Sequence, residues 1–77
     1  MEKPLELIVE ALLFASSKPL NVQEIHRCLP DIPLPDVKAA LTSLQAAYDA
    51  MARSFCLKEV AEGYQIRTRS AYAPYVL

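Results

Sequence analysis

The chain has 77 residues, of which 53% are hydrophobic, and its formal net charge is −1 at pH 7. This length fits one small domain, and the near-neutral charge gives no bulk signal for binding nucleic acid or an anionic membrane. A small domain has much surface and little interior, so part of the apolar surface is expected to remain exposed and to need a partner.

The first expected helix spans residues 4–15, with Pro4 in its first turn. Glu6 and Glu10 lie one turn apart and predict a narrow, solvated polar stripe; they also interrupt the apolar run, which argues against a signal sequence or a membrane span. One apolar face would satisfy a core: Leu5, Ile8, Val9, Leu12 and Ala15. A second apolar group lies to one side of this face: Leu7, Ala11 and Phe14. Either the rest of the domain covers this group, or it forms a dimer or partner surface.

The next two helices form a helix-turn-helix pattern. Pro19 ends the first helix, and Asn21 followed by Glu24 has the spacing of a capping box, which opens a short helix over residues 22–29. Pro35 opens a longer helix over residues 35–53. Its apolar positions recur every three or four residues: Val37, Ala40, Leu41, Leu44, Tyr48 and Met51.

Residues 55–61 and 64–68 are expected to be two strands of a hairpin. They are joined by Glu62 and Gly63, the only glycine, which is expected to supply a positive φ in the turn. A hairpin after a helix-turn-helix is a wing. The sequence therefore predicts an α+β winged helix-turn-helix fold: three helices, a β-hairpin wing and a linking helix that begins at Ser70. The last segment stops while still apolar, which is typical of a fragment of a longer protein.

The outward side of the third helix lacks the charge that a DNA-reading helix needs. A helix that docks in a DNA groove carries a basic stripe, because phosphate neutralisation supplies most of the affinity. Here two acids cancel two bases among the outward positions, which are Asp36, Lys38, Thr42, Ser43, Gln45, Asp49 and Arg53. This pattern favours a winged helix that binds protein, and a DNA-binding transcriptional regulator is the alternative.

Two stretches, EALLFASSKPLNVQEI and LKEVAEGYQIRTRSAYAPYV, resemble the N-terminal half of the segregation and condensation protein B family. The second stretch is the more specific, and the resemblance covers about residues 6–76. Glu62 stands where many relatives have another glycine, which a two-residue turn tolerates.

The resemblance implies a bacterial, cytoplasmic, nucleoid-associated and non-enzymatic protein with two winged-helix domains in tandem. Residues 1–69 would be the first domain, and residues 70–77 would begin the helix leading to a second domain absent from this chain. The resemblance also implies a homodimer that binds the kleisin subunit, segregation and condensation protein A (ScpA), and through it the SMC ATPase. The complex would act in chromosome condensation and segregation, with at most indirect or weak DNA contact and no small molecule or membrane.

Several side chains are candidates for contacts. Leu7, Ala11 and Phe14 are the expected dimer or partner interface. Tyr72 and Tyr75 are expected to pack against the second domain, with stacking on nucleic-acid bases as the alternative. The wing contributes Gly63, Tyr64, Arg67 and Arg69; the two arginines are expected to be solvated or paired with Glu59 and Glu62, with DNA phosphates as the alternative.

The sequence offers no set of residues for catalysis, a cofactor or a metal. His26 has no spaced partner and is expected to be a solvated surface residue. Cys28 and Cys56 have no metal-binding spacing and are expected to be reduced, buried thiols. An enzyme is therefore disfavoured.

Overall fold

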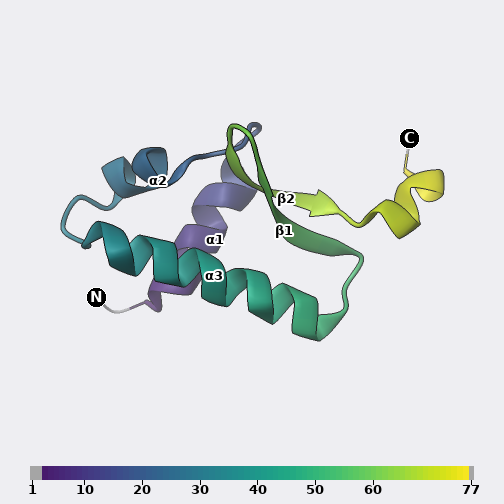
Figure 1. Ribbon diagram of the computed structural model, residues 1–77, viewed down its shortest axis with the longest axis horizontal. Helices are drawn as coiled ribbons and strands as arrows, with labels where there is room; N and C mark the ends of the chain where they lie inside the picture. The colour runs from purple at the N-terminus through teal and green to yellow at the C-terminus, as the bar shows by residue number, and fades with distance from the viewer. Residues whose placement is uncertain (1–2, 77) are drawn as a thin grey trace.

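The computed structural model describes residues 3–76; residues 1, 2 and 77, which belong to the two predicted domain spans, lie outside that part. Within it, the chain forms α1 (Leu5–Ala15), α2 (Val22–Cys28), α3 (Leu34–Met51), β1 (Phe55–Val60), β2 (Gly63–Thr68) and the 3-10 helix η1 (Ser70–Tyr75). The two strands pair antiparallel. Figure 1 shows α1 and α2 beside α3, the hairpin rising from the end of α3, and η1 at the far end. This is the predicted α+β winged helix-turn-helix.

The core lies between α1, α2, α3 and the base of β1. Its fully buried members come from three helices, and α3 supplies most of the buried face. The buried hydrophobic residues are Val9, Leu13, Ile25, Val37, Ala40, Leu41, Leu44, Tyr48 and Leu57. The predicted period of α3 is thus correct except at Met51, which is 54% exposed. Met51 is the last residue of α3, where that helix runs past the other two (Figure 1).

The orientation of α1 differs from the sequence prediction. Val9 and Leu13 are its buried residues, whereas Ala15, which was assigned to the core, is exposed. Glu6 and Glu10 are half-buried and hydrogen-bonded to α3, where fully solvated side chains were predicted: Ser43 Oγ donates a hydrogen bond to Glu6 at 2.9 Å, and the Tyr48 hydroxyl donates one to Glu10. Because α3 offers these hydroxyl donors, the two carboxylates can flank the core without losing their hydrogen bonds.

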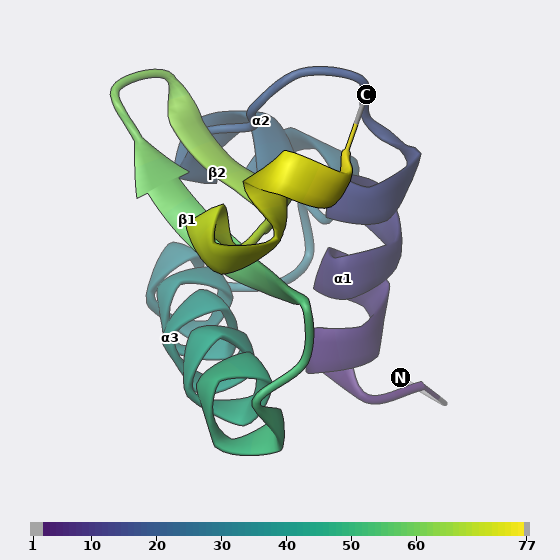
Figure 2. The same ribbon diagram turned by 90° about the vertical axis from the view of Figure 1, so that its right-hand side faces the viewer.

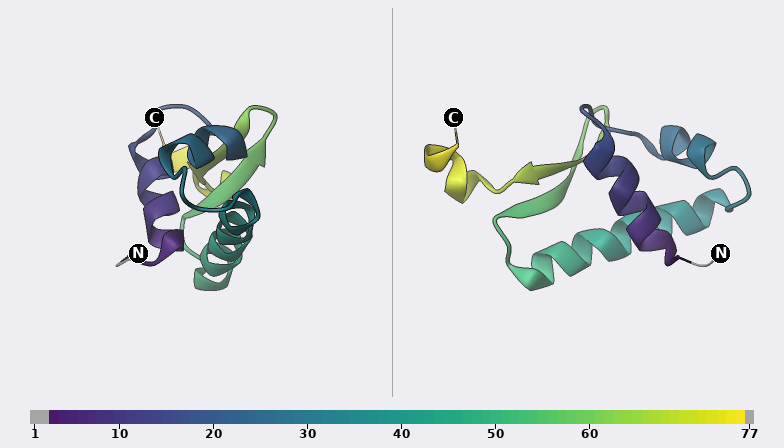
Figure 3. Two further views of the ribbon diagram at one scale, coloured as in Figure 1. Left: turned by 90° about the vertical axis from the view of Figure 1, so that its left-hand side faces the viewer. Right: turned by 180° about the vertical axis from the view of Figure 1, so that it is seen from behind.

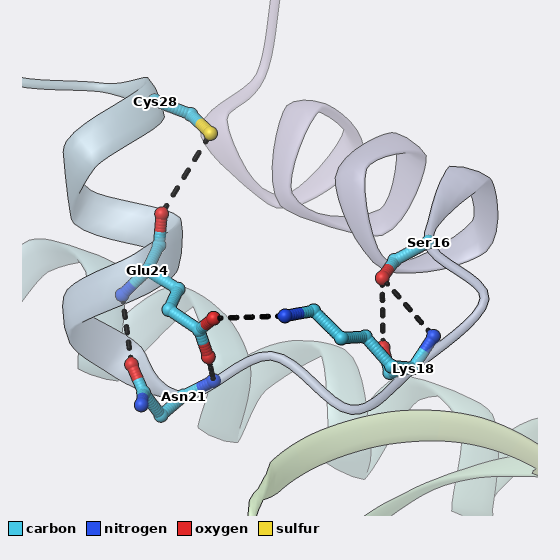
Figure 4. A network of polar contacts seen from close by, with 5 residues as sticks. All are labelled: Ser16, Lys18, Asn21, Glu24 and Cys28. Carbon is cyan, nitrogen blue, oxygen red and sulfur yellow. Dashed lines mark hydrogen bonds and ion pairs between the residues drawn. The ribbon is translucent and has the colours of Figure 1, made fainter.

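The predicted capping box is present at the start of α2 (Figure 4). Asn21 Oδ1 accepts a hydrogen bond from the Glu24 backbone at 2.8 Å, and Glu24 Oε1 accepts one from the Asn21 backbone at 3.0 Å. The Asn21 N–H, with smaller effects of Lys18 and Arg27, lowers the pKa of Glu24. Two orphan donors of the helix end are therefore satisfied reciprocally.

Three residues of α2 and β1 have surroundings other than those predicted. His26 is half-buried and not a solvated residue, since its Nε2 lies 2.8 Å from the carbonyl oxygen of Ile32 in the turn before α3. The thiols of Cys28 and Cys56 are free, but Cys28 is exposed and Cys56 is half-buried. Cys28 is the last residue of a short helix, which ends one residue before the predicted end.

The hairpin turn consists of Ala61 and Glu62, because Gly63 already pairs with Val60 as the first residue of β2. Gly63 has a φ of +139°, so the predicted positive φ is confirmed, but its place is in the strand and not in the turn. A glycine is needed at this place in the strand because another backbone segment lies beside it: Leu20, between α1 and α2, forms an isolated bridge with Tyr64.

The linking helix that was predicted to begin at Ser70 is present as a 3-10 helix. Arg69 is its N-cap, and Pro74 lies inside it. Figure 2 looks from that end of the molecule and shows η1 in front of the hairpin and α1. A second domain beyond it stays a prediction.

Candidate protein-binding surface

The outward face of α1 is apolar along its whole length. Leu7 is 54% exposed and Phe14 is 81% exposed, and the exposed Ala11 and Ala15 complete the face. The side of α1 that carries Glu6 and Glu10 faces α3, since both carboxylates accept hydrogen bonds from that helix. Figure 3 shows α1 in front of α3 when the molecule is seen from behind. A helix face of this kind normally meets another protein surface.

This face is hollowed near the start of α1. A shallow depression of about 370 Å³ is lined by Lys3, Leu7, Ile8, Ala11 and Leu12. Leu7 and Ala11 are predicted interface residues. Ile8 and Leu12 were predicted to lie in the core, but they are only half-buried and line the same depression. The period of the helix could have shown this, because Ile8 and Leu12 lie between the core face and the outward face.

The outward side of α3 carries few charges and several alanines. Asp36, Lys38 and Asp49 are its charged residues, and Arg53 lies beyond the end of the helix. Gln45, which was expected to face outward, is half-buried and donates a hydrogen bond to the Leu57 carbonyl at 3.2 Å. Four alanines of α3 that were not among the predicted outward positions are also exposed: Ala39, Ala46, Ala47 and Ala50. This helix presents no basic stripe for DNA.

Arg69 is bound to the end of α3 and is neither solvated nor paired with Glu59 or Glu62. Its Nε donates to the Arg53 carbonyl at 2.7 Å, and its Nη2 donates to the Tyr48 carbonyl at 3.2 Å. The same nitrogen pairs with Asp49 at 3.3 Å. The last carbonyls of a helix have no partner within it and carry partial negative charge, so they attract a guanidinium.

The other wing residues have local partners. Arg67 is exposed, and its Nε donates to Gln65 on the same strand at 2.7 Å. Tyr64 is half-buried, and burial, with a smaller effect of the neighbouring Glu59, raises the pKa of its hydroxyl. Gly63 and Tyr64 therefore build the wing, and a contact of Arg67 with a partner stays a prediction.

The two tyrosines of η1 are exposed, Tyr72 at 43% and Tyr75 at 83%. Val76, directly after them, is 54% exposed. Their predicted contact with a second domain stays a prediction. These three residues form a second exposed apolar surface in the described part of the chain, in addition to the outward face of α1.

The described part of the chain covers residues 3–76. In that range, no three His, Cys, Asp or Glu side chains gather as a metal ion would need. None of the helices there is long and apolar enough to cross a membrane.

The fold and these surfaces define a winged-helix domain whose exposed helical faces are apolar or nearly neutral. Residues 7–77 match the family of the segregation and condensation complex subunit ScpB. The chain belongs to this family, as the resemblance of its sequence predicted.

Three comparisons give the extent of the similarity. The chain is 39% identical to segregation and condensation protein B of Syntrophotalea carbinolica, over 94% of this chain and 36% of that protein. It superposes on ScpB of Mycobacterium tuberculosis with a TM-score of 0.82 and 25% identity, over 92% of this chain and 44% of that one. A dimer of an ScpB N-terminal domain complexed with an ScpA peptide has a TM-score of 0.82 and 32% identity, over 95% of this chain and 84% of that one. The chain spans about a third of the length of the curated relatives it matches.

Proposed function

We propose that the chain is the dimerising part of a non-enzymatic scaffold subunit of the bacterial condensin complex. It forms a homodimer that binds the kleisin ScpA and, through ScpA, the SMC ATPase, at the nucleoid in the cytoplasm. Its task is to hold the ATPase assembly in one geometry during chromosome condensation and segregation.

The outward face of α1 carries this proposal. Phe14 and Leu7 stand 81% and 54% exposed on a helix face without charge. Fully burying such a side chain stabilises an assembly by about 1.5–3 kcal/mol, so a few of them from each copy can form the centre of an interface. Association itself costs several kcal/mol, and a polar rim has to contribute the rest.

The solved complex supports both parts of the proposal. That N-terminal domain is a dimer with an ScpA peptide bound, and the present chain covers 84% of its length at 32% identity. By this similarity, we propose that two copies of the present chain form apolar grooves that receive a helical or extended ScpA segment.

Sedimentation and calorimetry test this proposal. The unmodified chain should sediment as a dimer and bind an ScpA peptide. Leu7→Glu should give a folded monomer, because a charge cannot be buried in an apolar contact, and it should bind the peptide at least about tenfold more weakly. Gln23→Glu, on the exposed side of α2, is the matched control and should leave both properties unchanged. A folded Leu7→Glu variant that remains a dimer would exclude this face, and unfolding of the variant would assign Leu7 to the core.

A DNA-binding regulator is the rival function, and titration with duplex DNA at several salt concentrations separates the two. We expect weak binding, with a dissociation constant of about 10⁻⁴ M or higher at physiological salt, because α3 has one lysine against two aspartates. Tight binding with a steep salt dependence, in a chain that ignores ScpA, would overturn the proposal.

A further inference from the structure

Two apolar surfaces of this chain stand apart from each other. One is the outward face of α1 with its depression, and the other is η1, where Tyr75 is 83% exposed. Figure 1 and the right-hand view of Figure 3 show that η1 projects from the end of the molecule and does not fold back on α1. Arg69 holds the base of η1 to the carbonyls at the end of α3, so the projecting helix starts from a fixed point.

We propose that η1 of one copy docks on the outward face of α1 of a second copy, and that the two copies exchange this contact around a two-fold axis. This inference rests on the homodimer proposed above and names the surfaces that form it. The right-hand view of Figure 3 shows α1 facing the viewer with η1 set to one side. A two-fold axis carries η1 of one copy onto η1 of the other and α1 onto α1, so a contact between η1 and the partner's α1 forms twice.

The chemistry of the two surfaces is complementary. The depression on α1 is lined by four aliphatic side chains and by Lys3. A tyrosine suits such a site, because its ring can lie against aliphatic carbons while its hydroxyl stays with the polar groups at the edge. Phe14, further along the same face, offers an aromatic partner to the other tyrosine of η1.

The exposed aromatic side chains supply about half of the area that a dimer needs. The exposed fractions of Phe14, Tyr72 and Tyr75 are 81%, 43% and 83%. At about 150–250 Å² for each aromatic side chain, these three residues alone offer on the order of 300–500 Å² per copy. A specific interface takes about 800 Å² from each partner, and Leu7, Val76 and their neighbours can supply the remainder.

A second copy is a better occupant for η1 than a second domain of the same chain. The solved ScpB N-terminal domain is a dimer, and the present chain covers 84% of it. A dimer therefore forms in a relative that extends little beyond the residues aligned with this chain. The contact of η1 with a second domain is an outcome that the test can reveal.

A mixing experiment tests the exchange. Phe14→Glu disables the α1 surface and Tyr75→Glu disables η1, so each variant alone should dimerise at least about 100-fold more weakly, since each substitution occurs at both contacts. In a mixture, the intact α1 of the Tyr75 variant meets the intact η1 of the Phe14 variant. One complete contact is restored, and sedimentation should show a heterodimer that neither variant can form with itself.

Gln23→Glu is the matched control and should dimerise as the unmodified chain does. Circular dichroism checks that each variant is folded. If Phe14→Glu or Tyr75→Glu is not folded, Leu7→Glu and Tyr75→Ser take their places in the experiment. If Tyr75→Glu dimerises normally while Phe14→Glu does not, the inference is wrong but the homodimer stands. If both variants are monomers and mixing restores nothing, the exchange is likewise excluded. If the unmodified chain is itself a monomer, the proposed homodimer fails together with the inference.

Discussion

Gly63 lies directly against the backbone of Leu20. A Cβ atom on Gly63 would overlap the Leu20 carbonyl group and the Asn21 nitrogen. Next to this contact, Leu20 and Tyr64 exchange two backbone hydrogen bonds of 3.0 and 2.7 Å. The segment between α1 and α2 is thereby attached to the wing, and this close approach of two backbones requires glycine.

Gly63→Ala should therefore destabilise the domain by about 2–4 kcal/mol. Its φ of +139° is strained for any L-residue, which costs about 1–3 kcal/mol, and the methyl group would also push the Leu20 backbone away. Urea denaturation measures the free energy of unfolding. Glu62→Ala, in the exposed turn beside it, should stay within about 0.5 kcal/mol of the unmodified protein. Equal midpoints for Gly63→Ala and the unmodified chain would contradict the contact.

Arg69→Ala should destabilise the domain by about 1–2 kcal/mol. It removes hydrogen bonds to the carbonyls of Tyr48 and Arg53 and leaves Asp49 without its partner. Thermal and urea unfolding provide the measurement. Arg67→Ala is the matched control, since it loses the same charge from the same wing but only an exposed contact with Gln65. If the two variants lost the same free energy of unfolding, the effect would come from the removed charge and not from the attachment of Arg69 to α3.

The hydroxyl of Tyr48 should make stability fall at high pH. Burial, and then the hydrogen bond and charge of Glu10, raise its pKa from 10.0 to about 12. Between these two pKa values the folded state keeps a proton that the unfolded state has lost. The contribution of the Tyr48 hydroxyl to the free energy of unfolding is therefore complete below pH 10 and disappears as the pH rises through 12. Tyrosinate absorbance should show one group that ionises late, and Tyr48→Phe should remove it. A Tyr48→Phe variant with the same decline in stability over this range would refute this origin.

The capping box of α2 should lose strength in acid. Asn21→Ala should cost about 1 kcal/mol near neutral pH, whereas Gln23→Ala, on the same first turn, should cost much less. The pKa of Glu24 is lowered from 4.5, so its contribution is complete above that pH and is lost as the pH falls through the lowered pKa. Thermal unfolding of Glu24→Gln should be less sensitive to acid than that of the unmodified chain. The same sensitivity in both would contradict the role of the carboxylate.

The order and type of the elements follow from local signals in the sequence. Proline and the capping box separated the first three helices, the helical period placed most of the α3 core, and alternation around one glycine predicted the wing. The surplus apolar side of α1 was also readable, since Leu7, Ala11 and Phe14 recur at helical spacing.

The contacts between these elements depend on how the chain packs in three dimensions. The hydroxyls of Ser43 and Tyr48 turn Glu6 and Glu10 toward α3, the Leu20 backbone explains why Gly63 stands in β2, and the end of α3 holds Arg69. Each of these contacts joins residues that lie sixteen or more positions apart in the chain. Local propensity is blind to such pairs, because the gain of each hydrogen bond or close approach exists only after the helices and the wing have packed.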